Sequence, residues 1–278
     1  MSGHIAGKSI VITGAGGGFG SLVAKKAAAL GARVTLGDID LAAAQGVTDA
    51  IIGAGGKAQA VAVDVRDLGQ VKALVAAALD AFGRVDVMIN NAGIMPLAFF
   101  SDHEAAYPAW ERCIDINIKG VLNGMVAAYD QMIAAGRGQM VNISSIYGNF
   151  PVIGAAVYGA SKSAVNFLSE SLRVESRGKI KVTTIKPTGV PTTGLSGTVV
   201  NQAAGIGIVA HNMSDFMEMV GEMAAGTFPP ERLDPEAMDY ASLAPEHIAD
   251  AVIHAIDQPW GVSIAEVTVR AAGDHFVL

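Results

Sequence analysis

Short apolar runs alternate with segments of helical spacing along most of the chain. Strand-length runs of apolar and β-branched residues occur at 9–13, 33–38, 57–63, 85–89, 140–144, 179–186 and 263–270. Segments with apolar residues three and four apart lie mostly between them, at 19–30, 41–52, 68–82, 118–135, 157–177 and 245–256. Alternating strands and helices with short connections favour parallel strands and right-handed crossovers. The pattern predicts an α/β fold with a doubly wound, seven-stranded parallel sheet and helices on both faces.

Two stretches depart from this pattern. Residues 101–131 indicate two helices that meet near Asn117, where an asparagine inside a helix usually answers a local hydrogen-bonding need. Residues 194–230 show no regular alternation and are rich in Gly, Ala and Met. Methionines at helical spacing are more often plain packing than a ligand surface. This second stretch therefore does not identify a site by itself.

Composition favours one well-packed domain. The 278 residues are within reach of a single α/β domain, and no stretch in the middle has the composition of a linker. Apolar residues make up 51% of the chain and charged residues 16%, a balance that favours a large buried core over disorder. We therefore expect a single domain over residues 1–278.

Charge and cysteine content exclude several classes of protein. The net charge of -7 disfavours a nucleic acid or an anionic membrane as partner, because both require a basic patch. A single cysteine, Cys113, forms no internal disulfide, and no Cys/His cluster has metal-ligand spacing. The first residues lack the apolar region of a signal peptide, and the run that follows is too short to span a membrane. These features predict a cytoplasmic protein without a metal.

A glycine-rich turn follows the first apolar run. Residues 14–20 read G-A-G-G-G-F-G, between a predicted strand and a predicted helix. Glycines let the backbone approach a pyrophosphate, and the N-terminus of a helix presents N–H groups and the positive end of the helix dipole. A purely structural turn is the alternative. The order of strand, turn and helix favours a dinucleotide site in a Rossmann-type fold.

Asp38 ends the second predicted strand, about twenty residues after the turn. An acid at this position accepts hydrogen bonds from the adenosine ribose 2′-hydroxyl, and it repels a 2′-phosphate. Neither neighbour, Gly37 or Ile39, offers a basic group to such a phosphate. NAD is therefore expected in preference to NADP. Asp38 could also cap the helix that follows, and the two roles are compatible.

Tyr158 and Lys162 lie four residues apart in a predicted helix. Side chains at this spacing share a face of the helix, so a phenol and an ammonium group can address one point. A cation within roughly 4–6 Å favours the ionised phenol, whose reference pKa is about 10. The pair alone is weak evidence, because an exposed tyrosine beside a snorkelling lysine is common. We expect proton chemistry only if other motifs agree.

The combined motifs resemble the classical short-chain dehydrogenase/reductase family over nearly the whole chain. Residues 13–20 match its T-G-x-x-x-G-x-G turn, residues 90–93 match its N-N-A-G motif, and residues 158–162 match its Y-x-x-x-K motif. Ser145 lies thirteen residues before the tyrosine, where the family has its catalytic serine, and this spacing favours it over Ser144. Asn117 occupies the place of the asparagine in the family's tetrad.

The resemblance implies a catalytic set of Asn117, Ser145, Tyr158 and Lys162. Tyr158 would exchange a proton with the substrate while hydride passes to or from the nicotinamide. Thr188 stands where the family has a glycine, which puts the backbone path of the loop after Pro187 in doubt. Contacts with the cofactor are expected from Gly14, Gly18, Phe19, Gly20, Asp38, Asp64, Val65, Asn91, Ala92, Gly93, Tyr158, Lys162, Pro187, Val190 and Thr192.

The expected substrate is a neutral, fairly hydrophobic secondary alcohol or ketone. The resemblance makes residues 194–230 a substrate loop, and the expected pocket neighbours are mostly apolar: Met95, Pro96, Leu97, Tyr147, Thr188 and residues 199–223. A hydrolase would need a G-x-S-x-G elbow, and a metal-dependent dehydrogenase would need ligand histidines; neither pattern is found. An NADP-dependent ketone reductase and a non-catalytic NAD-binding sensor are the alternatives. The family is commonly tetrameric, and burial against another subunit would explain the partly apolar tail up to Leu278.

Overall fold

A parallel sheet of seven strands forms the centre of the computed structural model, which describes residues 3–190 and 193–277. The strand order is β3-β2-β1-β4-β5-β6-β7, and every neighbouring pair is parallel. The strands are β1 (Ser9–Thr13), β2 (Arg33–Asp38), β3 (Lys57–Ala62), β4 (Val87–Asn90), β5 (Gly138–Ile143), β6 (Ile180–Pro187) and β7 (Glu266–Val269). The order reverses between β1 and β4, and open α/β sheets bind ligands at the carboxyl ends of such strands. The predicted fold class is confirmed.

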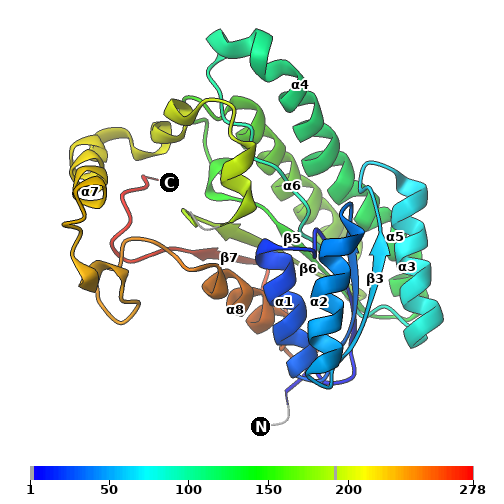
Figure 1. The fold of residues 1–278 in the computed structure, drawn as a ribbon. Helices are drawn as coiled ribbons and strands as arrows, with labels where there is room; N and C mark the ends of the chain where they lie inside the picture. The colour runs from blue at the N-terminus through cyan, green and yellow to red at the C-terminus, as the bar shows by residue number, and fades with distance from the viewer. Residues whose placement is uncertain (1–2, 191–192, 278) are drawn as a thin grey trace.

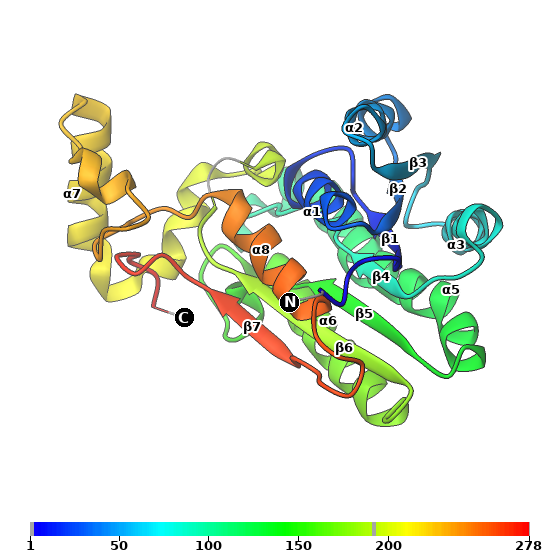
Figure 2. The same cartoon turned by 90° about the horizontal axis from the view of Figure 1, so that it is seen from below.

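Helices cover both faces of the sheet (Figure 2). One face carries α1 (Gly18–Ala29), α2 (Leu41–Gly53) and α8 (Pro245–Ile256), and the other carries α3 (Leu68–Phe82), α5 (Gly120–Ala134) and α6 (Ala156–Glu175). Each layer buries its own apolar cluster against the sheet, with Val23 and Val252 in the first and Leu74 and Val165 in the second. Apolar burial of this kind stabilises by about 25 cal/mol per Å², so the two layers hold the strand ends in place.

The predicted junction near Asn117 is a stretch of π-helix. Helix α4 (His103–Cys113) continues through the π-helical segment η2 (Ile114–Lys119) into α5. The wider turn is uncommon and occurs most often at functional sites. Asn117 is fully buried within it. The two predicted helices are therefore one continuous helical element, with Asn117 in its π-helical segment.

The irregular stretch lies beyond the carboxyl ends of the strands, and we call residues 194–233 the lid. It contains the 3-10 segments η4 (Gly194–Thr198), η5 (Gln202–Asn212) and η6 (Pro230–Leu233), and a helix, α7 (Met213–Ala225). In Figure 1, α7 lies away from the sheet, and the red segment that follows β7 runs towards α7. In the described ranges, no helix has the length and apolar content needed to cross a bilayer.

Candidate active site

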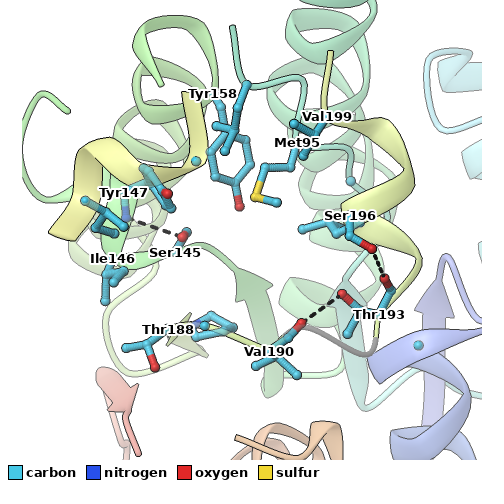
Figure 3. Close-up of a pocket in the computed structure, with 18 of the residues that line it drawn as sticks. Met95, Ser145, Ile146, Tyr147, Tyr158, Thr188, Val190, Thr193, Ser196 and Val199 are labelled. Atoms are coloured by element: carbon cyan, nitrogen blue, oxygen red, sulfur yellow. Dashed lines mark hydrogen bonds between the residues drawn. The ribbon is translucent and has the colours of Figure 1, made fainter. Parts of the chain in front are cut away.

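A cavity of about 670 Å³ lies at the carboxyl ends of the strands. The glycine-rich turn after β1, the loop after β4, the end of β5, helix α6, the loop after β6 and the lid all contribute to its wall. Figure 3 shows the part of the cavity around Ser145 and Tyr158, with Met95 and Val199 opposite. The predicted cofactor residues that line it are Gly14, Gly18, Phe19, Asn91, Ala92, Gly93, Tyr158, Lys162, Pro187 and Val190.

The glycine-rich turn has the geometry of an anion cradle. Gly14 and Gly18 both adopt positive φ, at 64° and 50°. A Cβ on Gly14 would lie 2.8 Å from the Cα atom of Ala92, so the turn packs directly on the loop after β4. Helix α1 begins after Gly17 with no side-chain cap and no acid in its first turn. Its positive dipole end is therefore open to a ligand anion.

Asn91 ties this turn to the loop after β4. Its Nδ2 atom donates hydrogen bonds of 2.9 Å to the carbonyl oxygens of both Thr13 and Gly14. In return, the Thr13 hydroxyl accepts from the backbone N–H groups of Asn91 and Ala92. These reciprocal bonds explain why an asparagine follows β4 and a threonine ends β1. They fix the spacing between the two walls of the cavity.

Four of the expected cofactor residues do not line the cavity. Asp38 lies behind the turn, and its Oδ2 atom accepts a hydrogen bond of 2.8 Å from the Gly16 N–H. Asp64 forms a salt bridge of 2.5 Å with Arg66, which lowers the pKa of its carboxyl group. Val65 is buried among apolar residues, and Gly20 supports the turn from within α1. A fifth, Thr192, lies outside the described residues.

Two glycines bring Ser145 to helix α6. Ser145 follows β5 and caps the short 3-10 segment η3 (Ile146–Gly148), where its hydroxyl accepts from the Tyr147 N–H. A Cβ on Gly148 would lie 2.8 Å from the carbonyl carbon of Lys162, and one on Gly159 would lie 2.9 Å from the carbonyl oxygen of Tyr147. Only glycine allows η3 to pack this closely on α6. The serine and tyrosine side chains consequently face the same cavity.

Tyr158 and Lys162 are deeply buried, at 3% and 5% exposure. The Tyr158 hydroxyl points into the cavity (Figure 3), and its ring meets that of Tyr147 edge to face, with 5.5 Å between centroids. The Lys162 ammonium lies 5.7 Å from the Tyr158 ring centroid and donates one hydrogen bond, of 2.9 Å, to the Ile143 carbonyl. An ammonium group has three donors, so two remain for other partners.

The pKa of Tyr158 differs from the sequence-based expectation. Burial raises the pKa of the Tyr158 phenol above its ordinary value, and the nearby Ser145 side chain opposes this only in part. In the protein alone, burial rather than Lys162 therefore sets the direction of the shift in the pKa of Tyr158, which differs from the expectation that Lys162 makes the phenol acidic. Burial also lowers the pKa of Lys162 to about 8, so its charged form still prevails at pH 7.

Asn117 supports the site from behind. Its Oδ1 atom accepts a hydrogen bond of 3.0 Å from the Ile94 N–H, and its Nδ2 atom donates to the Ile94 carbonyl and to the Ser161 hydroxyl. Ser161 in turn donates to the Tyr158 carbonyl. A Cβ on Gly93 would lie 3.3 Å from Asn117 and 3.6 Å from the Lys162 ammonium. The asparagine thus connects α6 with the loop after β4.

The predicted pocket neighbours are mostly in place, and one lining residue, Phe276, had no sequence signal. Met95, Leu97, Tyr147 and Thr188 line the cavity, whereas Pro96 does not. Further lining residues come from the expected substrate loop: Leu195, Ile206, Ile208, Phe216 and Val220. In the tail, Phe276 also lines the cavity and packs within its own chain. No local motif marks Phe276.

Comparisons with known proteins agree with this geometry. The family model described as short chain dehydrogenase matches residues 8–203. The 2,5-dichloro-2,5-cyclohexadiene-1,4-diol dehydrogenase LinX of Sphingobium indicum is 37% identical over 194 residues, which cover 69% of this chain and 76% of LinX. A metagenomic short-chain oxidoreductase in complex with NADP is 29% identical, with a TM-score of 0.72 over 96% of this chain and 98% of the other. A short-chain dehydrogenase/reductase from Burkholderia phymatum in complex with NAD is 27% identical, with a TM-score of 0.74 over 95% and 89%.

Proposed function

The chain belongs to the classical short-chain dehydrogenase/reductase family, and from this premise we propose that it interconverts a neutral, hydrophobic secondary alcohol and its ketone with NAD(H) as cofactor. One observation carries the proposal. Ser145, Tyr158 and Lys162 meet in a largely apolar cavity whose other end is a glycine-rich anion cradle. The same cavity therefore has room for both reactants, the dinucleotide and the substrate with its reacting oxygen.

The residues present fit a dinucleotide. The turn containing Gly14 and Gly18 would hold its pyrophosphate at the start of α1, Asp38 its adenosine ribose, and Lys162 its nicotinamide ribose. Pro187 and Val190 line the wall beside the position of the nicotinamide. When bound, the cofactor would supply the hydride acceptor or donor and, when oxidised, a positively charged ring.

Tyr158 is the proposed general acid/base. In the oxidative direction its phenolate takes the proton of the alcohol, and in the reductive direction its phenol returns that proton to the carbonyl oxygen. Lys162 contributes a positive charge one helical turn away, Ser145 holds the substrate oxygen, and Asn117 anchors the proton relay behind them. General acid/base catalysis contributes about 10² to 10⁴-fold, and positioning supplies much of the remainder.

The lining supports a neutral, apolar substrate. Among the described residues that line the cavity, Lys162 is the only charged one. No guanidinium or second ammonium group is present there to hold a carboxylate or a phosphate, and an unpaired anion would be costly to desolvate. Val199, Met219 and Met223 extend the apolar wall into the lid, which we propose as the substrate loop. The name of LinX identifies a cyclic diol as its substrate, which favours cyclic alcohols as the first compounds to test.

Asp38 supports NAD in preference to NADP. Its carboxylate already accepts from the turn that would hold the pyrophosphate, and a phosphate 4 Å away would be repelled by about 4 kcal/mol at an effective dielectric of 20. One of the two solved relatives contains NADP and the other contains NAD. The proposed preference for NAD therefore depends on Asp38. A homotetramer in the cytoplasm remains the expectation from family and composition.

The proposal is tested by steady-state kinetics with NAD and NADP against a panel of cyclic, aromatic and short-chain secondary alcohols and their ketones. We expect turnover with neutral apolar compounds and a higher kcat/KM with NAD, and we expect Asp38→Ser to raise kcat/KM with NADP by about tenfold or more. An anionic best substrate would contradict the assignment of the pocket. Binding of NADH without any turnover would instead favour the sensor alternative.

A further inference from the structure

The segment after β7 closes one side of the cavity. Phe276 lines the cavity, and its ring lies directly against Gly189 in the loop after β6. A Cβ on Gly189 would lie 2.5 Å from the Cζ atom of Phe276. Gly189 is not among the glycines with positive φ. The ring of Phe276 therefore occupies the space that a side chain at position 189 would take, whereas the backbone conformation of Gly189 makes no demand for glycine.

This packing lies next to a departure from the family motif. The family's glycine is replaced by Thr188, and Gly189 follows it. The backbone N–H of Thr188 remains bonded to the Val269 carbonyl of β7, at 3.3 Å. The loop thus stays attached to the sheet. The ring of Phe276 lies where the Cβ atom of any other residue at position 189 would be.

The lid holds Phe276 in place. The Val277 N–H donates to the Ile208 carbonyl at 3.2 Å, and the Asn212 side chain donates to the His275 carbonyl at 3.0 Å. The His275 ring also meets the ring of Phe216 edge to face, with 6.1 Å between centroids. Both flanking residues of Phe276 are thus bonded to residues of the lid.

A turn within the segment orients the ring from the other side. Asp274 accepts a hydrogen bond of 3.1 Å from the Phe276 N–H and forms a salt bridge of 2.6 Å with Arg270. Phe276 packs against the apolar cluster of Ile146, Ile208 and Val209, and Ile146 directly follows Ser145. The ring therefore lies on the Ser145 side of the cavity.

We propose that Phe276 is a specificity-determining residue that limits the size of the substrate substituent on the Ser145 side of the cavity. The inference rests on the proposed function and extends it to the shape of the substrate. Its ring is a wall set between the loop after β6 and the lid, so a compact cyclic ketone fits and a larger ring does not. A hydrophobic pocket discriminates about tenfold or more for each methylene that it cannot accommodate.

The test compares Phe276→Ala and Phe276→Leu with the unmodified protein on a series of cycloalkanones from five to twelve carbons. Dissociation constants are measured from the change in fluorescence of bound NADH, and kcat/KM is measured in parallel. We expect the largest ring to gain about tenfold or more in affinity relative to the smallest in Phe276→Ala, with a smaller gain in Phe276→Leu. The dissociation constant of NADH should stay within about twofold. Phe167→Ala, at an exposed position on α6, is the matched control.

A double-mutant cycle tests the contact itself. Gly189→Ala should displace the ring and lower the thermal midpoint, whereas the same change in the Phe276→Ala background should have little effect, because the methyl group then has room. An unchanged ranking of ring sizes in both Phe276 variants, or equal effects of Gly189→Ala in both backgrounds, would overturn the proposal. The dissociation constants are measured without turnover. If the proposed reaction does not occur, the ketone will bind but no product will form, and the effect of Phe276 on ring size can still be measured.

Discussion

Replacing Tyr158 by Phe is expected to lower kcat by about 10² to 10⁴-fold in both directions of the reaction. The hydroxyl points into the cavity from a ring that is 3% exposed (Figure 3), and Ser145 shares that cavity. The substitution removes the group that exchanges a proton with the substrate oxygen and keeps the ring that packs against Tyr147. The loss should therefore appear in kcat, while the dissociation constant of NADH stays within about twofold of the unmodified value.

A matched tyrosine separates this effect from a general one. Tyr107 is 58% exposed on α4 and is not among the residues that line the cavity, so Tyr107→Phe should leave kcat unchanged. Both variants are compared by steady-state kinetics and by NADH titration. A Tyr158→Phe enzyme that keeps more than about a tenth of the original kcat would mean that another group transfers the proton.

Gly20→Ala is expected to have the largest effect on cofactor binding. The new Cβ would overlap the Gly14 carbonyl and lie 2.7 Å from the Asn91 Nδ2 atom. That amide connects the glycine-rich turn to the loop after β4. Since backbone atoms cannot move aside as a flexible side chain does, the turn itself must shift. Overpacking of this kind costs about 1–3 kcal/mol. We expect a thermal midpoint lower by several degrees and a dissociation constant for NADH raised by about tenfold or more.

Gly46→Ala is the control for this prediction. Gly46 is in α2, and a Cβ there would have no atom within 4 Å. Alanine inside a helix is favoured over glycine by about 0.5–1 kcal/mol, so this variant should be as stable as the original or more so. Equal behaviour of the two variants in both measurements would show that the packing of the turn on Asn91 does not govern cofactor binding.

The sheet was predictable because each strand carries its own signal. Central strands such as β1 and β4 are buried along their whole length and are largely apolar. All seven runs are found as strands within a few residues of their predicted bounds. The motifs that line the cavity were predictable for a related reason. The glycine-rich turn, the residues after β4 and the pair on α6 each depend on neighbours close in sequence or on the ends of adjacent parallel strands.

The place of the tail was not predictable because its partners are distant in sequence. Phe276 packs on Gly189 and Ile208, so no local periodicity records its position. The direction of the pKa shift of Tyr158 was not predictable for a comparable reason. Spacing indicates that Lys162 is one turn away, but it does not indicate how deeply the phenol is buried, and burial decides the direction of the shift in the protein alone.

Tyr158 is expected to become a usable base when the oxidised cofactor binds. Its ionisation is measured most directly as the ultraviolet difference spectrum between the unmodified protein and Tyr158→Phe, titrated alone, with NAD and with NADH. Because burial raises the pKa of Tyr158, we expect no ionisation below about pH 10 in the protein alone. With NAD, the positively charged ring should lower the pKa by at least about one unit relative to the complex with NADH, whose ring is neutral. Identical titrations in all three conditions, together with full turnover, would contradict the account.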